Sequence, residues 1–231
     1  MILALIVTCT LIGFQGNNMT NSVLGVRNIQ HTNGTDAMTI ATDGGVTFSN
    51  PPAGSIIEVL TGICMGGSQT VQSGSYTFPN VTALQSLSTS YADITGSSFS
   101  YTPPVGTKRV KYELEAKLQA IGYSGISHYK FFIDSTEVVD ARRTMNFSYS
   151  SSNQGNLYQT FTWIIDCAAD TADANAGSFT SWTTAKTMKW QGRNYDSSYQ
   201  MRLHTNRWWD GTSASGTNNV SPPFLTITAY A

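Results

Sequence analysis

The chain has 231 residues, of which only 12% are charged, and its formal net charge at pH 7 is −1. Since about a quarter of residues are charged in ordinary globular proteins, Ser and Thr must supply most of the polar side chains here, and Gly is also frequent. This composition is typical of β-rich extracellular and virion proteins. The near-neutral charge provides no basic field that could hold phosphates, so nucleic acid is not an expected partner.

The first segment, residues 1–14, is almost entirely apolar. It is too short for a comfortable membrane span, and it lacks the basic start of a signal peptide because the first cation is Arg27. Three interpretations stay open: a weak signal peptide, a segment buried in an assembly, or an upstream extension with Met19 as the natural start. No membrane span is expected.

The next segment has the pattern of a very small hairpin. Met38–Ile40 and Val46–Phe48 are short alternating runs, and the Asp43–Gly45 sequence between them is typical of a turn. A Pro-Pro break follows at residues 51–52. Because an isolated two-stranded hairpin is marginally stable in water, this region is expected to need a partner chain or a surface.

Three β-like stretches follow, before a second Pro-Pro pair at residues 103–104. They are Ser55–Cys64, Gln69–Val81 and residues 84–102. The two Pro-Pro pairs have the sequence of hinges. The stretches therefore form either a separate β-rich neck or the first strands of the domain that follows.

The clearest strand of the chain begins after Lys108 and runs to Gln119, with a period of two. Its apolar face carries Val110, Tyr112, Leu114, Ala116 and Leu118. Its polar face carries Lys111, Glu113, Glu115 and Lys117. The charges on this polar face discourage edge-to-edge pairing with another sheet.

About seven or eight strands are expected from residue 108 to the end, with turns at the spacing of a β-sandwich. The expected segments after the first are His128–Ile133, Glu137–Val139, Met145–Tyr149, Tyr158–Ile165, Lys186–Tyr195, Tyr199–His204 and Phe224–Tyr230. Asp134-Ser135 is expected to be a tight turn, and residues 166–177 a loop or one short helix. The last strand follows Pro222-Pro223, and we expect it to fill a central position in a sheet.

No group of residues predicts an enzyme. The three His residues lie in distant segments without metal-ligand spacing, and there is no GxSxG, phosphate-binding Gly loop or GxGxxG motif. Cys9, Cys64 and Cys167 form neither an even disulfide framework nor a CxxC pair, and reduced thiols are expected. We therefore predict no catalytic residues, no metal site and no cofactor.

The strongest binding candidate is the run RLHTNRWWDG at residues 202–211. Adjacent Trp residues on a strand point to opposite faces, so at most one of them can be in the core. The chemistry fits a subunit interface, where Trp and Arg are enriched, a sugar-stacking receptor contact, or packing within one subunit. The candidate residues are Arg202, His204, Arg207, Trp208, Trp209 and Asp210.

Residues 31–60 resemble the adaptor segments of tail-fibre and capsid-appendage proteins from tailed phages of marine bacteria and from algal viruses. The phrase TNGTDAMTI, the later run from Thr82 to Tyr91 and the YTPPVG run from Tyr101 to Gly106 carry the resemblance, which extends over residues 24–120. The resemblance implies a homotrimeric virion protein whose N-terminal region docks on other capsid or tail proteins.

From pattern and resemblance together, we expect an all-β chain with an antiparallel, jelly-roll-like β-sandwich head. The expected divisions are an N-terminal attachment segment (1–54), a β-rich neck or first head strands (55–105) and the head (106–231). The expected function is that of a non-enzymatic fibre or appendage subunit on the virion surface, with a host glycan as a further partner. The alternatives are a purely structural capsid decoration or minor capsid protein, a secreted lectin-like adhesin, and a carbohydrate-active enzyme. The last would need paired carboxylates across a groove.

Overall fold

The protein is described here from a computed structural model, and the chain divides into two compact units, residues 1–52 and 53–231. The described residues are 28–30, 36–40, 46–48, 51–121, 124–148, 156–206 and 220–231. Within them there are strands and turns but no helix. The apolar residues 1–14, for which three interpretations are open, lie outside the described part.

In the first unit, three short strands form one antiparallel sheet in the order β1-β2-β3. They are β1 (Asn28–Gln30), β2 (Asp36–Ile40) and β3 (Val46–Phe48). The predicted hairpin corresponds to β2 and β3, and Met38 pairs with Phe48. The sequence analysis missed β1, which is only three residues long.

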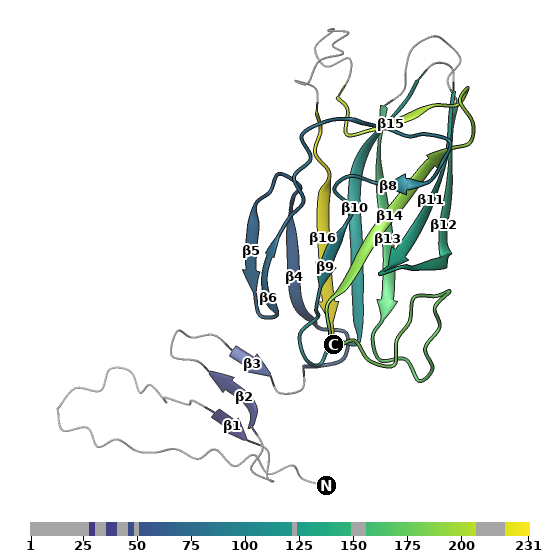
Figure 1. The fold of residues 1–231 in the computed structure, drawn as a ribbon. Coiled ribbons are helices and arrows are strands. Elements are labelled where there is room, and N and C mark those ends of the chain that lie inside the picture. Colours follow the sequence, from purple (N-terminus) through teal and green to yellow (C-terminus); the bar gives the residue numbers. More distant parts are fainter. Residues whose placement is uncertain are drawn as a thin grey trace, which may run out of the picture. The chain divides into compact units, whose positions relative to one another are not determined.

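The second unit contains two antiparallel sheets, shown in Figure 1. In the first sheet the main strands lie in the order β4 (Ile56–Ile63), β16 (Phe224–Tyr230), β10 (Arg109–Ala120) and β13 (Asn156–Asp166). Beyond the end of β16, the short strands β15 (Met201–Leu203) and β7 (Gln85–Ser86) continue this sheet beside β10.

The second sheet faces the first across the core. Its strands are, in spatial order, β12 (Thr136–Ser148), β11 (Ser124–Ile133) and β14 (Lys186–Asn194). The short strands β8 (Ala92–Asp93) and β9 (Phe99–Tyr101) follow, and each pairs with a different part of β14. A separate hairpin joins β5 (Ser68–Val71) to β6 (Gly74–Thr77).

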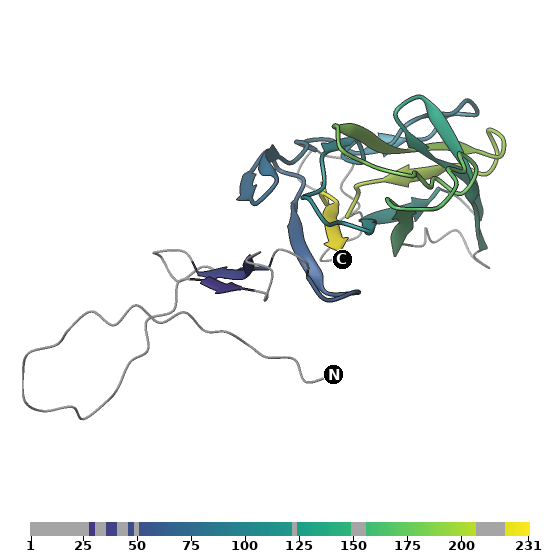
Figure 2. The ribbon, with the colours of Figure 1, turned by 90° about the horizontal axis from the view of Figure 1, so that it is seen from below.

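The pairing of the eight principal strands is nested from the outside inward. The first of them in the chain, β4, pairs with the last, β16; β9 pairs with β14, β10 with β13, and β11 with β12. This is the strand order of a jelly roll, two Greek keys wrapped into a sandwich. The predicted all-β, antiparallel β-sandwich is confirmed, and β4 and β16 can be followed side by side in Figures 1 and 2.

The core lies between the two sheets and consists of the side chains that alternation places inward. All five apolar residues predicted for the inner face of β10 are at most 1% exposed. Aromatic rings of both sheets meet at the centre, where Trp190 lies 5.1 Å from Phe131 and 5.2 Å from Phe161. Burial of each large apolar side chain stabilises the fold by about 1.5–3 kcal/mol.

β10 lies inside its sheet, because β16 and β15 pair along one side of it and β13 along the other. The charged face predicted for this strand is the outer face of the sheet, where Lys111 forms a 2.6 Å ion pair with Glu113. Residues 166–177, expected to be a loop or one short helix, contain no helix, which leaves the loop. The expectation of two separate segments within residues 137–149 is wrong, because they belong to one continuous strand, β12.

The edge of β4 is covered by a side chain that imitates a neighbouring strand. Oε1 of Gln69 accepts a hydrogen bond from the Thr61 N–H at 2.9 Å, and its Nε2 donates to the Val59 carbonyl at 3.2 Å. One glutamine of the β5–β6 hairpin thereby satisfies two backbone groups of β4. Such cover prevents an edge strand from pairing with another chain.

A substitution at Gly96 would measure how tightly this residue is packed against Pro223 and Val81. Its φ is +86°, and a Cβ at this position would lie 2.7 Å from both Pro223 Cγ and Val81 Cγ2. We expect Gly96→Ala to destabilise the protein by about 2–5 kcal/mol, combining left-handed strain with overpacking. Gly54→Ala is the matched control, because Gly54 has a φ of +80° but no atom within 4 Å of its Cβ position.

Chemical denaturation of both variants measures the difference. Gly54→Ala should lower the free energy of unfolding by about 1–2 kcal/mol, because only the left-handed backbone is strained. Equal losses of stability in the two variants would contradict the close packing described here.

Candidate functional site

Two regions at opposite ends of β10 are candidate functional sites. The first contains the residues that the sequence singled out, near the end of β10. Of these, Arg202 and His204 are described, whereas Arg207, Trp208, Trp209 and Asp210 lie outside the described residues. The structure therefore places two of the six candidates.

Arg202 and His204 have different environments. Arg202 is half-buried on β15 and lies directly opposite Gln119 of β10. His204 is fully buried, and its backbone is in the left-handed region with a φ of 62°. Its N–H donates to the Lys117 carbonyl at 2.9 Å, and its carbonyl accepts from Ser221 at 2.9 Å.

The His204 ring is an unusual buried polar group, because neither ring nitrogen makes a regular hydrogen bond. Burial lowers the pKa of His204 to about 4 by removing the solvation of the imidazolium, and the nearby Thr95 backbone offsets this only in part. The ring is therefore neutral at physiological pH. Being buried, it is not an exposed contact for a ligand.

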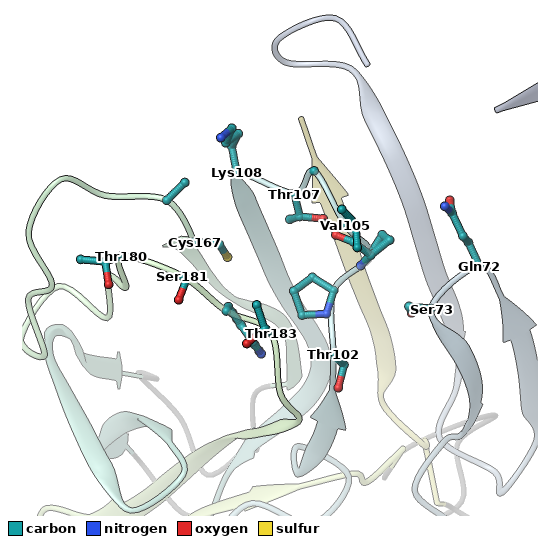
Figure 3. Close-up of a pocket in the computed structure, with 15 residues that line it drawn as sticks. Gln72, Ser73, Thr102, Val105, Thr107, Lys108, Cys167, Thr180, Ser181 and Thr183 are labelled. Atoms are coloured by element: carbon teal, nitrogen blue, oxygen red, sulfur yellow. Dashed lines mark hydrogen bonds between the residues drawn. The ribbon is translucent and has the colours of Figure 1, made fainter. Parts of the chain in front are cut away.

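The second region is a pocket of about 560 Å³ near the start of β10. Four segments form its wall: residues 72–73 between β5 and β6, residues 102–108 before β10, residues 167–168 after β13, and residues 180–183 before β14. Figure 3 shows Thr180, Ser181 and Thr183 on one side and Gln72 and Ser73 on the other.

A buried carboxylate fixes one wall of this pocket. Glu58 is only 5% exposed and accepts three hydrogen bonds: from the Ser73 N–H at 2.8 Å, the Ser73 hydroxyl at 2.6 Å and the Tyr101 hydroxyl at 2.8 Å. Burial and the adjacent carboxylate both raise the pKa of Tyr101, so its hydroxyl stays a donor. Tyr76 extends the network by donating to the Thr102 carbonyl at 3.1 Å.

The lining of the pocket is rich in hydroxyl groups and poor in charge. Its hydroxyl residues are Ser73, Thr102, Thr107, Thr180, Ser181 and Thr183. Lys108 is the only charged residue of the lining. Burial raises the pKa of the lining thiol of Cys167 to about 12, so this thiol is not a nucleophile at neutral pH. The chemistry suits a neutral polyhydroxylated ligand.

Among the described residues, no cluster of three or more His, Cys, Asp or Glu side chains is arranged to hold a metal ion. Cys64 and Cys167 are both buried free thiols. The part of the chain that the structure describes holds no helix with the length and hydrophobicity that a membrane span needs.

No protein-family model matches this chain, and no curated protein matches it. Among solved structures, it is similar to a chain of the "Structure of infectious bursal disease virus Gt strain", with 11% sequence identity and a TM-score of 0.23. The match covers 85% of this chain and 47% of that chain, so this chain spans about half its length. A TM-score this low carries no argument about fold or function, and the fold assignment rests on the strand order.

Sequence reasoning missed the pocket, although it noted one of its segments. Pro103-Pro104 was interpreted as a hinge, and in the structure it forms part of the wall. The Ser/Thr-rich run at residues 180–184 was available as a signal, but nothing local indicates that it lies near residues 72–73. Only the sheet order brings these segments together.

The buried His204 predicts a pH dependence of stability. Its pKa falls from 6.5 to about 4 on folding, so its contribution to stability is complete above pH 6.5 and is lost as the pH falls toward 4. The full effect is about 3 kcal/mol. We expect His204→Asn, which tolerates a positive φ, to flatten the stability profile between pH 6.5 and 4.

Denaturant unfolding at several pH values checks this slope. His128→Asn is the control, because burial and Arg193 lower the pKa of His128 while its side chain stays near the surface, with Nδ1 3.0 Å from the Thr144 hydroxyl. If the free energy of unfolding of His204→Asn changed with pH as steeply as that of the unsubstituted protein, the assignment of a buried, neutral His204 ring would be contradicted.

Proposed function

We propose that this chain is a non-enzymatic structural protein of a virus particle, a fibre or appendage subunit. Residues 1–54 would dock on other proteins of the particle, and the jelly-roll unit would be the exposed head. The observation that carries the proposal is the nested strand order of the head, since jelly rolls are a common architecture of viral capsid and lectin domains.

Two further features support this assignment. The first unit, residues 1–52, is compact in its own right and separate from the head by its contacts, as an attachment segment would be. The surface is polar mainly through hydroxyls, since only 12% of residues are charged. A weakly charged head resists nonspecific electrostatic adhesion to nucleic acid and membranes.

The proposed assembly is a homotrimer, as the resemblance to fibre proteins implies. Its support is physical: the three strands of the first unit are three to five residues long, and such small sheets are stable only against a further layer. Light scattering of the full chain should give three times 25.0 kDa, and a mass of 25.0 kDa at every concentration would contradict the trimer.

The location of the protein tests the proposal directly. Antibodies against the head should label intact purified particles of the virus that encodes the chain, and the chain should be found in them by mass spectrometry. Antibody absorbed beforehand with the purified protein is the control. Detection only in the envelope fraction of uninfected cells would contradict a virion protein and favour a secreted adhesin.

A role in attachment to host glycans is the second part of the proposal, and the hydroxyl-rich pocket favours it. Neutral hydroxyls beside one amine are suited to hydrogen-bonding a sugar. On a glycan array, the full chain should bind a defined set of sugars. The variant Ser181→Trp, which fills the pocket, should lose at least about tenfold in affinity, or about 1.4 kcal/mol.

The matched control for this test is Ser90→Trp, an equally large substitution at an exposed position outside the pocket. Equal binding by both variants would place any glycan contact elsewhere on the head. An array without any signal would favour a purely structural decoration protein.

A further inference from the structure

The edge strand β13 lacks the protection that the other long edge strands of the head have. Among the described residues it pairs with β10 only, over its whole length of 11 residues. From Asn156 to Ile165 its sequence, NLYQTFTWII, has no charged residue, no proline and no glycine. Natural sheets usually protect such an edge with charges, prolines or bulges.

The contrast with the other edges is clear. Gln69 covers β4 through two hydrogen bonds. The edge strand of the second sheet, β12, carries Glu137, Asp140, Arg142 and Arg143, and the Asp140 N–H donates to the Asn175 carbonyl at 3.1 Å. Strands β7, β8 and β9 have only two or three residues each.

Two hydrogen bonds at the end of β13 show which backbone groups point outward. The Cys167 N–H donates to the Lys108 carbonyl next to β10, whereas the Asp166 carbonyl accepts from Phe179 on the other side. Backbone groups of successive strand residues point to opposite sides. The N–H and C=O groups of Tyr158, Thr160, Thr162 and Ile164 therefore point away from β10, along the free edge.

The same four residues project their side chains onto the outer face of the sheet. Tyr158 is 64% exposed and Ile164 is 55% exposed. The Thr160 carbonyl accepts a hydrogen bond from the side chain of Gln159 at 2.7 Å, a contact that an incoming strand can replace. The Lys117 ammonium lies 5.5 Å from the centre of the Tyr158 ring and borders this surface.

This sequence is complementary to itself. When two copies of β13 run antiparallel with Phe161 at the centre, Tyr158 of each lies opposite Ile164 of the other, and Thr160 opposite Thr162. Both are favourable cross-strand pairs, aromatic with β-branched and Thr with Thr. In this register all four outward-pointing residues of one strand face outward-pointing residues of the other, so their backbone groups can form a regular ladder.

We propose that β13 is a contact between two copies of this chain, in which residues 158–164 pair antiparallel about a twofold axis at Phe161 and join the two first sheets into one. The twofold makes each side-chain pair occur twice. The contact is independent of how residues 1–52 assemble, and on a particle it would link the heads of neighbouring subunits, whose high local concentration strengthens a small interface.

Disulfide trapping in the full chain tests both the contact and its register. Thr160→Cys and Thr162→Cys are made as separate proteins, and each is oxidised alone and as a mixture. Opposite residues of a hydrogen-bonded pair have Cα atoms about 5.5 Å apart, within disulfide range. We expect a linked dimer in the mixture, with the 160–162 link identified by mass spectrometry. Each protein alone should give little, because equal positions are diagonal neighbours about 7–8 Å apart.

A matched pair of isoleucines supplies the control. Ile164→Lys is expected to reduce the cross-linked fraction of the mixture about tenfold, because two Tyr–Ile pairs are lost and the new cation faces the partner's Lys117. Ile63→Lys on β4, at a residue 51% exposed on the same outer face, should leave it unchanged.

Three results would overturn the proposal. They are the absence of any cross-link in the mixture at high protein concentration, equal linkage in the separate proteins, and equal sensitivity to the two lysine substitutions. The second result would mean a different register or a different partner strand at this edge. The chain without substitutions, whose Cys64 and Cys167 are buried, provides the background.

Discussion

The head depends on the insertion of β16 between β4 and β10. Its inward side chains Leu225, Ile227 and Ala229 are at most 1% exposed, and it hydrogen-bonds along both sides. β4 begins at residue 56 and β16 ends at residue 230. The first and last strands of the jelly roll must therefore meet before their backbone N–H and C=O groups can bond to each other. Such long-range pairing makes folding slow and cooperative, because loop-closure entropy is lost before the contacts form.

The shortage of charge affects the interior as well as the surface. Buried polar groups in this chain rely on hydroxyls and backbone groups, as the Glu58 carboxylate does with Ser73 and Tyr101. A carboxylate with several donors is tolerable in a core. The His204 ring makes no regular hydrogen bond, and its burial lowers the stability of the head as the pH falls toward 4.

The same shortage shapes the edges of the sheets. Where other proteins place lysines, this head uses a glutamine side chain on β4 and ion pairs beside β12, in which Glu137 contacts Lys130 at 2.9 Å and Arg142 at 2.6 Å. On β13 no ion pair protects the described edge, and its Gln159 side chain bonds only the Thr160 carbonyl. A protein that works in many copies can use such an edge, whereas a monomeric protein would be exposed to aggregation.

The sequence by itself determined the class of fold and the two faces of most strands. The period of two in β10 and β11 identified residues such as Tyr112 and Phe131 as core, and both are fully buried. The Asp134-Ser135 turn and the central position of the last strand were also predictable from local signals. Alternation is a property of each segment alone, and burial of one face follows from it directly.

Only the tertiary structure decided which strands are neighbours. The composition of both candidate sites depends on this strand order, because each site is built from segments that are distant in the sequence. Alternation identified the two faces of β10, but only the pairing shows that β10 lies inside the sheet and that β13 is its edge. The pocket joins four segments between residues 72 and 183, and the His204 N–H is bonded to Lys117, which is far from it in the chain. Alternation fixes the face that a side chain occupies, but the identity of the next strand is set by long-range pairing that no local pattern encodes.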